Sequence, residues 1–513
     1  MHSLSDFRPQ NLPAVSFAKL MASHGVNVSD ATVRGVTVDS ADVGKEEIFV
    51  AIAGAKTHGA QFAADAIAAG ASAIVTDTAG AQIVGDADVP VAVVPDPRAL
   101  AGELAKVVYD DPCSKLKVFT VTGTNGKTTT SCLLRAVLQS LGYPTAMIGT
   151  IDIATPNMTV AAVHTTTEAP LTLRVFAKAI EEGARAAVIE TSSHALALHR
   201  TAGLHFDVSG FLNLQHDHLD FHKTMEGYFA AKAKLFTPAL TDQAVICVDD
   251  EWGQKLTEIA TVPFVTSSGK GKEADYSGKA TQLEVGHTRF SLTHGGKVFP
   301  VELPYTGEVN VQNATLAVAM VAAAGLPLTD AIAAIAHADQ VPGRMHFLPK
   351  MPGVPVCGVD FAHTPDALEA LLTTLRPLTR GAVHLVFGSD GDRDASKRPI
   401  LGEIAARLAD YLWVTDENPR SEDPGSIRHQ IMVGVKQVRP DLHQVTEVTT
   451  CRRDALRYAT LAAKPGDIVF VTGKGVEPFQ EIQGVFHRYS DLEVLAECMR
   501  AYAHHGASRV SAS

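Results

Sequence analysis

A run of glycine, lysine and threonine residues near position 125 has the composition of a loop that binds phosphate. The run reads Gly123-Thr124-Asn125-Gly126-Lys127-Thr128-Thr129, between an apolar, β-prone stretch at 118–121 and a helical pattern that follows. Glycines let the backbone turn tightly around a phosphate, and the helix N-terminus presents N–H groups and a positive dipole to the anion. We expect Lys127 to reach the β- and γ-phosphates of a nucleotide and Thr128 to hold Mg²⁺. Only two residues separate the glycines, fewer than in the common P-loop, but a bare glycine turn would need neither the lysine nor the threonines.

A carboxylate and a group of histidines could bind a metal ion. Glu190 follows the apolar run 186–189, which places it at the carboxyl end of a predicted strand, and oxygen ligands suit Mg²⁺. Further along, the segment 216–222 holds three histidines and two aspartates in seven residues, a density that is also compatible with zinc. Residue types alone leave both metals open for His218. We expect the other two histidines of the segment, His216 and His222, to be solvated loop residues.

These groups must be positioned by an α/β fold. Short apolar, strand-like runs alternate with helical patterns from residue 118 onward, which predicts a parallel sheet covered by helices. A break at Val341-Pro342-Gly343-Arg344 separates this series from a second one of the same kind. We predict three domains: an N-terminal domain at 1–110, a central P-loop-type parallel-sheet ATPase domain at 111–343, and a C-terminal Rossmann-like, doubly wound domain at 344–513.

The composition excludes several classes of protein. The 513 residues carry 44 Lys and Arg against 56 Asp and Glu, a formal charge of −12. A general nucleic-acid binder is excluded, because such proteins need a net basic surface. The longest apolar stretches are too short to span a bilayer, so we expect no membrane insertion. The 6 cysteines include no CxxC pair and form neither a disulfide framework nor a zinc ribbon, which predicts a reducing, cytoplasmic location.

The phosphate loop resembles that of the Mur ligases and folylpolyglutamate synthetases. Further motifs resemble the branch of the Mur ligases that adds the third residue of the peptidoglycan stem peptide. They are Glu190-Thr191-Ser192-Ser193-His194, Asp217-His218-Leu219-Asp220, Ala231-Lys232, Val359-Asp360-Phe361-Ala362-His363-Thr364-Pro365-Asp366, Gly391-Asp392-Arg393-Asp394, Asn418-Pro419-Arg420 and Gly473-Lys474-Gly475. One motif could arise by chance, whereas this set follows the family order over nearly the whole chain and is very specific.

The resemblance implies an ATP-dependent amide ligase that works through an acyl phosphate. The other substrates would be UDP-N-acetylmuramoyl-L-alanyl-D-glutamate and a diamino acid, and the protein would mainly position reactants and neutralise charge. The implied catalytic and metal-binding residues are Lys127, Thr128, Glu190, His218 and Lys232, with Mg²⁺ rather than zinc as the metal. Lys232, by default a surface residue of a helix, would be carbamylated by CO₂, which requires a site that lowers the proton affinity of its amine. Lys234, two residues further on and expected on a different helix face, serves as the control for this role of Lys232.

The resemblance also selects residues for the nucleotide and for the UDP-sugar peptide. Asn313 would meet adenine, and Arg344 and Asp360 would meet phosphate and ribose. The residues for the UDP-sugar peptide are Val38, Ser40, Lys56, Thr57, His58, His164, Thr165, Thr166, Ser192, Leu198 and Arg200. Hydroxyls and an arginine suit diphosphate and carboxylate oxygens. His164 and Leu198 stand where the family has Asn and Gln, so one polar contact differs at each position.

A third group of residues would bind the incoming amino acid. It comprises Arg393, Glu417, Asn418, Pro419, Arg420, Gly473 and Glu477. The fork of Arg420 or Arg393 suits a second carboxylate, and Glu477 suits the distant ammonium. Asn-Pro-Arg is typical of family members that use meso-diaminopimelate, which we expect here. The chain departs from the family at Glu417 (usually Asp), Ser389-Asp390 (Cys-Gly), Val476 (His) and His346 (Glu).

Other interpretations are possible. The same reaction could use L-lysine or L-ornithine. A folylpolyglutamate synthetase is a second alternative, against which the N-terminal domain with Val38-Asp39-Ser40 argues, because a folate has no use for a UDP site. A non-catalytic nucleotide-binding protein is the third, and the presence of Lys127, Glu190 and Lys232 argues against it. We expect a monomer.

Overall fold

The computed structural model describes residues 2–54 and 57–510, and its first part is a small parallel sheet with helices around it. The strands follow the order β3 (Gly35–Thr37), β4 (Glu47–Ala51), β5 (Ala71–Thr76) and β6 (Val91–Val93). The other elements are η1 (Leu4–Phe7), β1 (Val15–Ser16), α1 (Phe17–Ala22), β2 (Thr32–Val33), η2 (Ser40–Asp42), η3 (Gly59–Phe62), α2 (Ala63–Ala69), α3 (Thr78–Val84) and α4 (Pro97–Val108). Adjacent strands of this sheet pair in parallel and alternate with helical connections.

The central part is built on a sheet of eleven strands. Its order is β10 (Thr159–Ala161), β9 (Asp152–Ala154), β8 (Thr145–Ile148), β11 (Ala186–Glu190), β7 (Lys117–Thr122), β12 (Phe206–Phe211), β13 (Thr241–Cys247), β14 (Phe264–Ser268), β15 (Tyr276–Glu284), β16 (His287–His294) and β17 (Lys297–Leu303). The helices are η4 (Pro112–Lys115), α5 (Lys127–Ser140), α6 (Ala169–Glu181), α7 (Ser193–Ala197), α8 (Leu219–His222), α9 (Met225–Ala233), α10 (Glu251–Ile259), α11 (Glu308–Ala323) and α12 (Leu328–Ile335).

The predicted parallel sheet is confirmed for the middle of this sheet but not for its edges. Strands β8, β11, β7, β12, β13, β14 and β15 pair in parallel, whereas β9, β10, β16 and β17 are antiparallel additions. For β16 and β17 the reason lies in the connections. Gly286 and the pair Gly295-Gly296 adopt positive φ between β15, β16 and β17, so tight turns replace helical crossovers.

The C-terminal part has a six-stranded sheet with helices on both faces. Its order is β18 (His346–Phe347), β19 (Val356–Asp360), β23 (Ile468–Thr472), β20 (Val383–Phe387), β21 (Tyr411–Val414) and β22 (Val445–Glu447), parallel except for β18. The helices are α13 (Pro365–Leu375), η5 (Arg376–Leu378), α14 (Lys397–Leu408), α15 (Pro424–Val438), α16 (Arg452–Ala462) and α17 (Asp491–Val510), and β24 (Phe479–Ile482) pairs with β25 (Val485–Arg488) as a separate hairpin.

Alternation along the strands builds two apolar cores, one on each face of this sheet. Leu385 and Phe387 of β20 pack with residues of α13, α14 and α15, whereas Val386 between them packs with residues of α16 and α17. Successive side chains of a strand point to opposite faces, so consecutive apolar residues such as Leu385, Val386 and Phe387 require cover on both sides. The doubly wound C-terminal domain predicted from the sequence is thereby confirmed.

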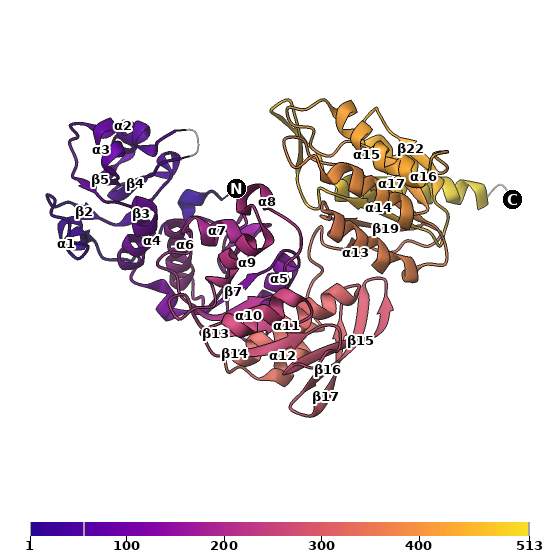
Figure 1. Ribbon diagram of the computed structural model, residues 1–513, viewed down its shortest axis with the longest axis horizontal. Helices are drawn as coiled ribbons and strands as arrows, with labels where there is room; N and C mark the ends of the chain where they lie inside the picture. The colour runs from indigo at the N-terminus through magenta and orange to yellow at the C-terminus, as the bar shows by residue number, and fades with distance from the viewer. Residues whose placement is uncertain (1, 55–56, 511–513) are drawn as a thin grey trace.

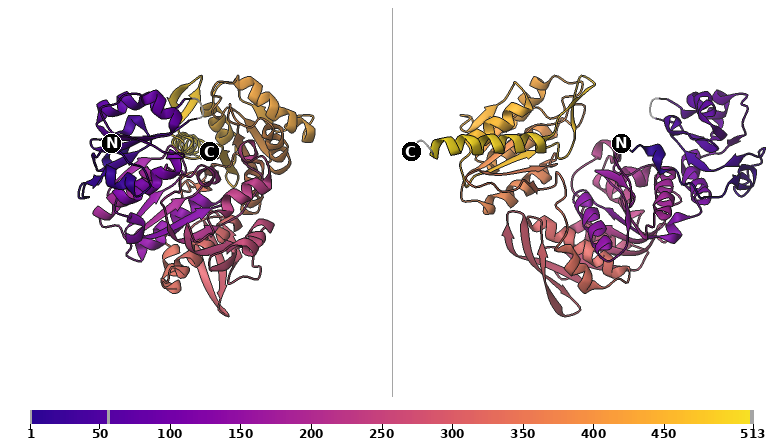
Figure 2. Two further views of the ribbon diagram at one scale, coloured as in Figure 1. Left: turned by 60° about the vertical axis from the view of Figure 1, so that its left-hand side comes forward. Right: turned by 180° about the vertical axis from the view of Figure 1, so that it is seen from behind.

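The outer parts are attached to the central part in different ways. One continuous apolar core contains Leu104 of α4 and Leu173 of α6, so the N-terminal part is packed directly on the central part. The two cores of the C-terminal part consist almost entirely of its own residues. Both outer parts project from the same side of the central part, at its opposite ends (Figures 1 and 2). Among the described residues, no helix is both long and apolar enough to cross a membrane.

Candidate active site

The phosphate loop lies where the sequence predicts it, between β7 and α5. Gly126 caps the helix with a φ of 87°, and a Cβ there would lie 2.3 Å from Asn313 Oδ1, so the position requires glycine. Lys127 folds back over the loop and donates to the carbonyl oxygens of Gly123 and Thr124, at 2.9 Å each. Burial lowers the pKa of the Lys127 ammonium, and the negative charge of nearby Glu190 opposes this shift only in part.

Glu190 and Thr128 meet at the carboxyl ends of two paired strands. Glu190 ends β11 and lies opposite Val121 of β7, one residue before that strand ends. Its Oε2 accepts from Thr128 Oγ1 at 2.9 Å and from Thr150 Oγ1 at 3.0 Å, and its Oε1 accepts from the Thr150 amide at 2.8 Å. The side chain is fully buried, and all three donors are uncharged. Thr150 is a partner that the sequence did not reveal.

Arg344 extends from the segment that joins the central and C-terminal parts. Its Nη2 donates to Thr128 Oγ1 at 3.4 Å, and its guanidinium lies 4.4 Å from the centre of the Phe361 ring. Asp360 is the last residue of β19. Its carboxylate accepts hydrogen bonds from the backbone amides of Met345 and Ala362, at 2.5 and 2.7 Å. A cation from one part of the molecule thus lies at the phosphate loop of another.

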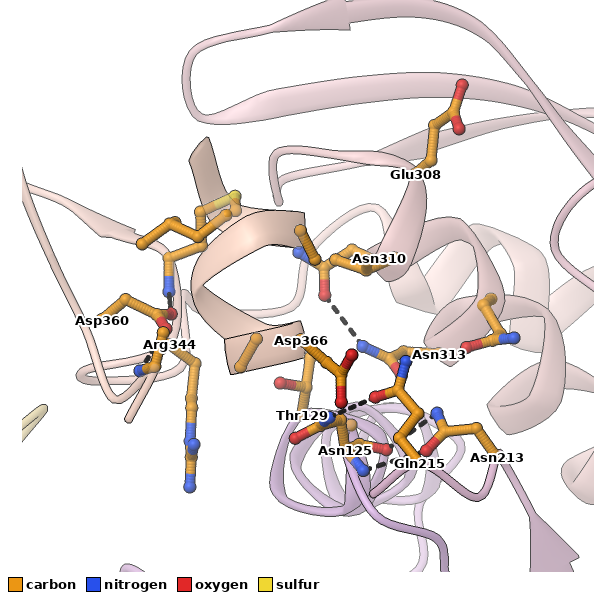
Figure 3. A pocket seen from close by; sticks show the side chains of 18 of the residues that line it. Asn125, Thr129, Asn213, Gln215, Glu308, Asn310, Asn313, Arg344, Asp360 and Asp366 are labelled. Carbon is orange, nitrogen blue, oxygen red and sulfur yellow. Dashed lines mark hydrogen bonds between the residues drawn. The ribbon is translucent and has the colours of Figure 1, made fainter. Parts of the chain in front are cut away.

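A cavity of about 400 Å³ opens at this junction (Figure 3). The predicted nucleotide residues Asn313, Arg344 and Asp360 all line it, together with Asn125, Gly126 and Thr129 of the phosphate loop. Asn313 lies on α11, where its Nδ2 donates to Asn310 Oδ1 at 3.0 Å. The lining also includes Asp366, the last residue of a motif quoted above, and residues that sequence reasoning missed: Asn213, Gln215, Asp249, Lys270 and Gln312. Most of these follow a strand at its carboxyl end, which is the signal that could have found them.

Lys232 is buried, so the default expectation of a surface helix residue is wrong. Its side chain is 1% exposed, and its Nζ donates to Gly123 O at 2.8 Å and to Thr122 Oγ1 at 3.3 Å. Tyr228, one helical turn earlier, places its ring 4.8 Å from that Nζ and shares a hydrogen bond with Thr124. Burial, and then the positive charge of Lys127, hold the pKa of Lys232 well below its ordinary value. Lys234, two residues on, is exposed.

His218 lies near Lys232 but in a more open position. It adopts the left-handed conformation with a φ of 55°, and its ring packs edge-on against His194 and Tyr228. Desolvation lowers the pKa of the His218 imidazole, against the opposing effect of Asp217. His222 is not a solvated loop residue as expected, because it shares a hydrogen bond with Ser193 Oγ at 2.9 Å and stacks on Tyr228. Within the described ranges, no group of three or more His, Cys, Asp or Glu is placed to hold a metal ion.

Part of the predicted UDP-sugar set lies beside Glu190. Thr166 Oγ1 donates to Glu190 O at 2.8 Å and to Ser192 Oγ at 3.3 Å, and Arg200 donates to Thr166 O at 3.3 Å. Thr165 accepts from Thr150 Oγ1 at 3.2 Å. Arg200 also pairs with Glu168, which in turn holds Arg98 of α4, so this cluster lies against the N-terminal part. The remaining members of this part of the set are His164, which is exposed, and Leu198, the C-cap residue of α7.

The other predicted UDP-sugar residues are in the N-terminal part. Val38 and Ser40 follow β3 and are half-buried, and His58 lies 3.2 Å from Asp77 and caps the short helix η3. Thr57 is exposed, and Lys56 lies outside the described residues. The structure thus divides this set between two places, one in the N-terminal part and one on the central part.

The predicted amino-acid residues gather at the carboxyl ends of β20, β21 and β23. Lys474 is fully buried, and its Nζ donates to Asn418 Oδ1 and Glu477 Oε2 at 2.7 and 2.8 Å. Glu417 is 3% exposed; burial, and then Asp390, raise the pKa of its carboxyl to about 8. Gly473 is required beside it, because a Cβ there would lie 2.2 Å from Glu417 Oε2. Pro419 and Arg420 follow in the same loop, whereas Arg393 is exposed.

Comparison with known proteins places this site in a family. Three family models match the chain: "Mur ligase family, catalytic domain" at residues 32–109, "Mur ligase middle domain" at 121–321, and "Mur ligase, glutamate ligase domain" at 343–475. The chain is 41% identical over 478 residues to a Corynebacterium glutamicum protein named UDP-N-acetylmuramoyl-L-alanyl-D-glutamate–2,6-diaminopimelate ligase, covering 91% of this chain and 92% of that one. The chain belongs to the Mur ligase family.

Two further Mur ligases extend this similarity to nearly the whole chain. A Streptomyces coelicolor protein of the same name is 39% identical over 500 residues, which cover 96% of this chain and 98% of that protein. A solved structure of a ligase with that name is 32% identical, has a TM-score of 0.67, and covers 96% of this chain and 100% of its own. The expected three-domain Mur ligase fold and ligase activity are thereby confirmed.

Proposed function

We propose that this Mur ligase joins meso-diaminopimelate to UDP-N-acetylmuramoyl-L-alanyl-D-glutamate, with ATP supplying the free energy. The observation that carries the proposal is the contact between Arg344 and Thr128, which joins the C-terminal part to the phosphate loop. Residues of both parts line a cavity of about 400 Å³ beside this contact. A nucleotide at that junction could pass its γ-phosphoryl group to an acid held on the central part. The names of relatives that match over nearly the full length support the identity of both substrates.

The reaction we propose has two steps. The substrate carboxylate attacks the γ-phosphorus of ATP, ADP leaves, and an acyl phosphate forms. The amine of the amino acid then attacks the acyl carbon, loses a proton, and expels phosphate. Lys127 and Arg344 supply positive charge toward the phosphates, and the first-turn N–H groups of α5 add the helix dipole. Asn313 and Asp360 hold the rest of the nucleotide, with Gly123, Thr124, Asn125 and Thr129 of the loop.

The residues around Glu190 fit a magnesium ion. This carboxylate is fully buried, and the described groups that donate to it are all uncharged. A buried carboxylate without a cationic partner is costly, and the oxygens of Glu190 and Thr128 are the donors that Mg²⁺ prefers. Bound there, Mg²⁺ would neutralise charge on the transferred phosphoryl group. We propose that His218 and Lys232 also contribute to this magnesium site.

The surroundings of Lys232 also fit carbamylation. CO₂ adds only to a neutral amine, and a lysine that is 1% exposed next to the ammonium of Lys127 favours that form. A carbamate would replace a cation by an anionic oxygen donor.

The remaining assignments follow from where the clusters lie. We assign the UDP-sugar peptide to Val38, Ser40, Lys56, Thr57, His58, His164, Thr165, Thr166, Ser192, Leu198 and Arg200, and the amino acid to Arg393, Glu417, Asn418, Pro419, Arg420, Gly473 and Glu477. We keep 1–110, 111–343 and 344–513 as the domain boundaries, and we propose a cytoplasmic monomer. A folate-specific role is less well supported, because residues 32–109 match a Mur ligase family model. The non-catalytic alternative is wrong, because relatives that match over nearly the full length are named as ligases.

The test is an assay of the purified protein with ATP, Mg²⁺, UDP-N-acetylmuramoyl-L-alanyl-D-glutamate and each of meso-diaminopimelate, L-lysine and L-ornithine. We expect turnover only when all substrates are present, with ADP and phosphate as products. Formation of AMP and pyrophosphate would rule out the acyl phosphate. Lysine or ornithine incorporated at least as fast as diaminopimelate would overturn the amino acid assignment and leave the ligase assignment intact.

A further inference from the structure

Two loops at the carboxyl ends of β20 and β21 place Asp390 beside Arg420. The loops are tied together by the Gly391 amide, which donates to Asn418 O at 2.8 Å. Fully buried Arg398 donates to Asp390 O at 3.0 Å and to both carboxylate oxygens of Glu422 at 2.8 Å. The backbone that carries Asp390 is therefore fixed by a buried cation. Asp390 is also one of the positions at which this chain departs from its family.

Arg420 is held as firmly as Asp390. Its φ is 53°, and it forms a β-bridge to Ile482, with its amide donating to Glu481 O at 3.0 Å and its carbonyl accepting from the Gln483 amide at 2.7 Å. A non-glycine residue in this conformation is uncommon and needs such support. The hairpin β24–β25 thus orients the guanidinium toward the loop that carries Asp390.

The contact between the two side chains leaves one polar atom of each without a partner. Arg420 Nη2 lies 3.4 Å from Asp390 Oδ2, and Arg420 Nε lies 3.9 Å from Glu481 Oε2, beyond hydrogen-bond distance. Arg420 Nε and Asp390 Oδ1 are both shielded from solvent and have no hydrogen-bond partner among the described residues. Buried polar atoms in this state are uncommon and call for an explanation, and a bound ligand would supply the missing partner for both.

Two more unpartnered groups lie in the same pair of loops. Glu417 is 3% exposed and Ser389 is 2% exposed, and neither Glu417 Oε2 nor Ser389 Oγ has a hydrogen-bond partner within the described residues. Glu477, by contrast, already holds the buried ammonium of Lys474 and the amide of Asn418 through its Oε2. The expected role of Glu477 toward the distant ammonium is therefore better suited to Asp390.

A cation and an anion side by side, each with a free atom, match a zwitterion. We propose that Asp390 and Arg420 together bind the distal amino-acid head of the incoming substrate, Asp390 taking its ammonium and Arg420 its carboxylate. This assignment rests on the proposed function. It makes Asp390 a specificity-determining residue: the site recognises a second ammonium and a second carboxylate on one carbon, and loses a charged hydrogen bond with any substrate that lacks either.

The test uses three amino acids and two variants of the full-length protein. Diaminopimelate carries both distal groups, L-lysine lacks the distal carboxylate, and 2-aminopimelate lacks the distal ammonium. For Asp390→Asn we expect kcat/KM for diaminopimelate to fall by about tenfold to a hundredfold, with 2-aminopimelate changing less than about threefold. For Arg420→Gln we expect the same loss with diaminopimelate and little change with lysine. Calorimetric binding of the three amino acids in the absence of ATP should show the same pattern.

The control is Asp423→Asn, which removes a carboxylate three residues from Arg420 but keeps a residue able to cap α15 through Ser426. It should leave all three substrates unchanged. Equal losses with diaminopimelate and 2-aminopimelate in Asp390→Asn would overturn the proposal, because they would show that Asp390 only holds Arg420 in place. That result leaves the ligase function standing. If the wild-type protein ligates none of the three amino acids, the proposed function fails, and this assignment fails with it.

Discussion

Lys127 and Lys232 donate hydrogen bonds to the same carbonyl oxygen, that of Gly123, from 2.9 and 2.8 Å. Two ammonium groups that converge on one acceptor repel each other, and the more deeply buried one, Lys232, has its pKa lowered furthest. The fold thereby lowers the proton affinity of the amine that we propose to be carbamylated, that of Lys232.

The first prediction concerns the chemistry of Lys232. Lys232→Ala should lose roughly a hundredfold or more in kcat, and formate or acetate should restore part of it as a diffusible oxygen donor. Lys234→Ala, at the exposed C-cap of the same helix, should change kcat by less than about twofold. Isotopically labelled bicarbonate gives an independent readout, since a carbamate NMR signal should appear in the wild type and not in Lys232→Ala. Equal losses in both variants without rescue would indicate an ordinary helix lysine.

The second prediction concerns how stability depends on pH. Because the pKa of Lys232 is lowered from 10.5 on folding, the unfolded chain binds more protons than the folded chain between the two pKa values. The free energy of unfolding of the wild type should therefore rise with pH in that window relative to Lys232→Met, by at most about 1.4 kcal/mol per pH unit. Urea unfolding of both proteins in CO₂-free buffer at about pH 7 and about pH 9.5 measures this. A difference that does not change with pH would contradict the buried-amine description.

The third prediction concerns Arg344 at the domain junction. Arg344→Ala removes the guanidinium that contacts Thr128, and should weaken ADP and ATP binding by about tenfold to a hundredfold. Arg289→Ala is the matched control, because Arg289 lies on β16 and pairs with Glu302 on the exposed edge of the central sheet. Calorimetric titration with ADP compares the two. Unchanged affinity in Arg344→Ala would place the phosphates elsewhere.

The fourth prediction compares two neighbouring arginines of α16. Arg452 is fully buried, as is its partner Asp491, and it also donates to Thr472 O at 2.7 Å, one residue before Gly473. Arg452→Met leaves Asp491 buried and unpaired, and should lower the free energy of unfolding by about 3–5 kcal/mol. Arg453 pairs with Glu497 in solvent, so Arg453→Met should cost less than about 1 kcal/mol. Urea unfolding of both variants gives the comparison, and similar losses would contradict it.

Several features of this protein could be predicted because they depend on residues that are neighbours in the chain. The strand, glycine loop and helix around Gly126 are continuous in sequence, so the phosphate loop was predicted at its observed place. The strand β20 is apolar except for His384, and side chains on both of its faces are buried, which requires cover on both sides and therefore a doubly wound sheet. The sequence analysis does not predict the antiparallel strands β16 and β17. The available signal was the alternation of polar and apolar residues at 289–292, followed by the turn residues Gly295-Gly296.

The tertiary structure decided which distant side chains come into contact. Arg344 and Thr128 are 216 positions apart, and Asp390 and Arg420 are 30 apart on the ends of neighbouring strands. In the sequence Lys232 cannot be told apart from other helix lysines, whereas in the structure its amine is buried against Thr122 and Gly123. Residue types and local periodicity set the elements, because backbone hydrogen bonds and turns form between chain neighbours. The proton affinity of a lysine and the partner of an arginine depend instead on the burial and the charges that distant segments bring to it.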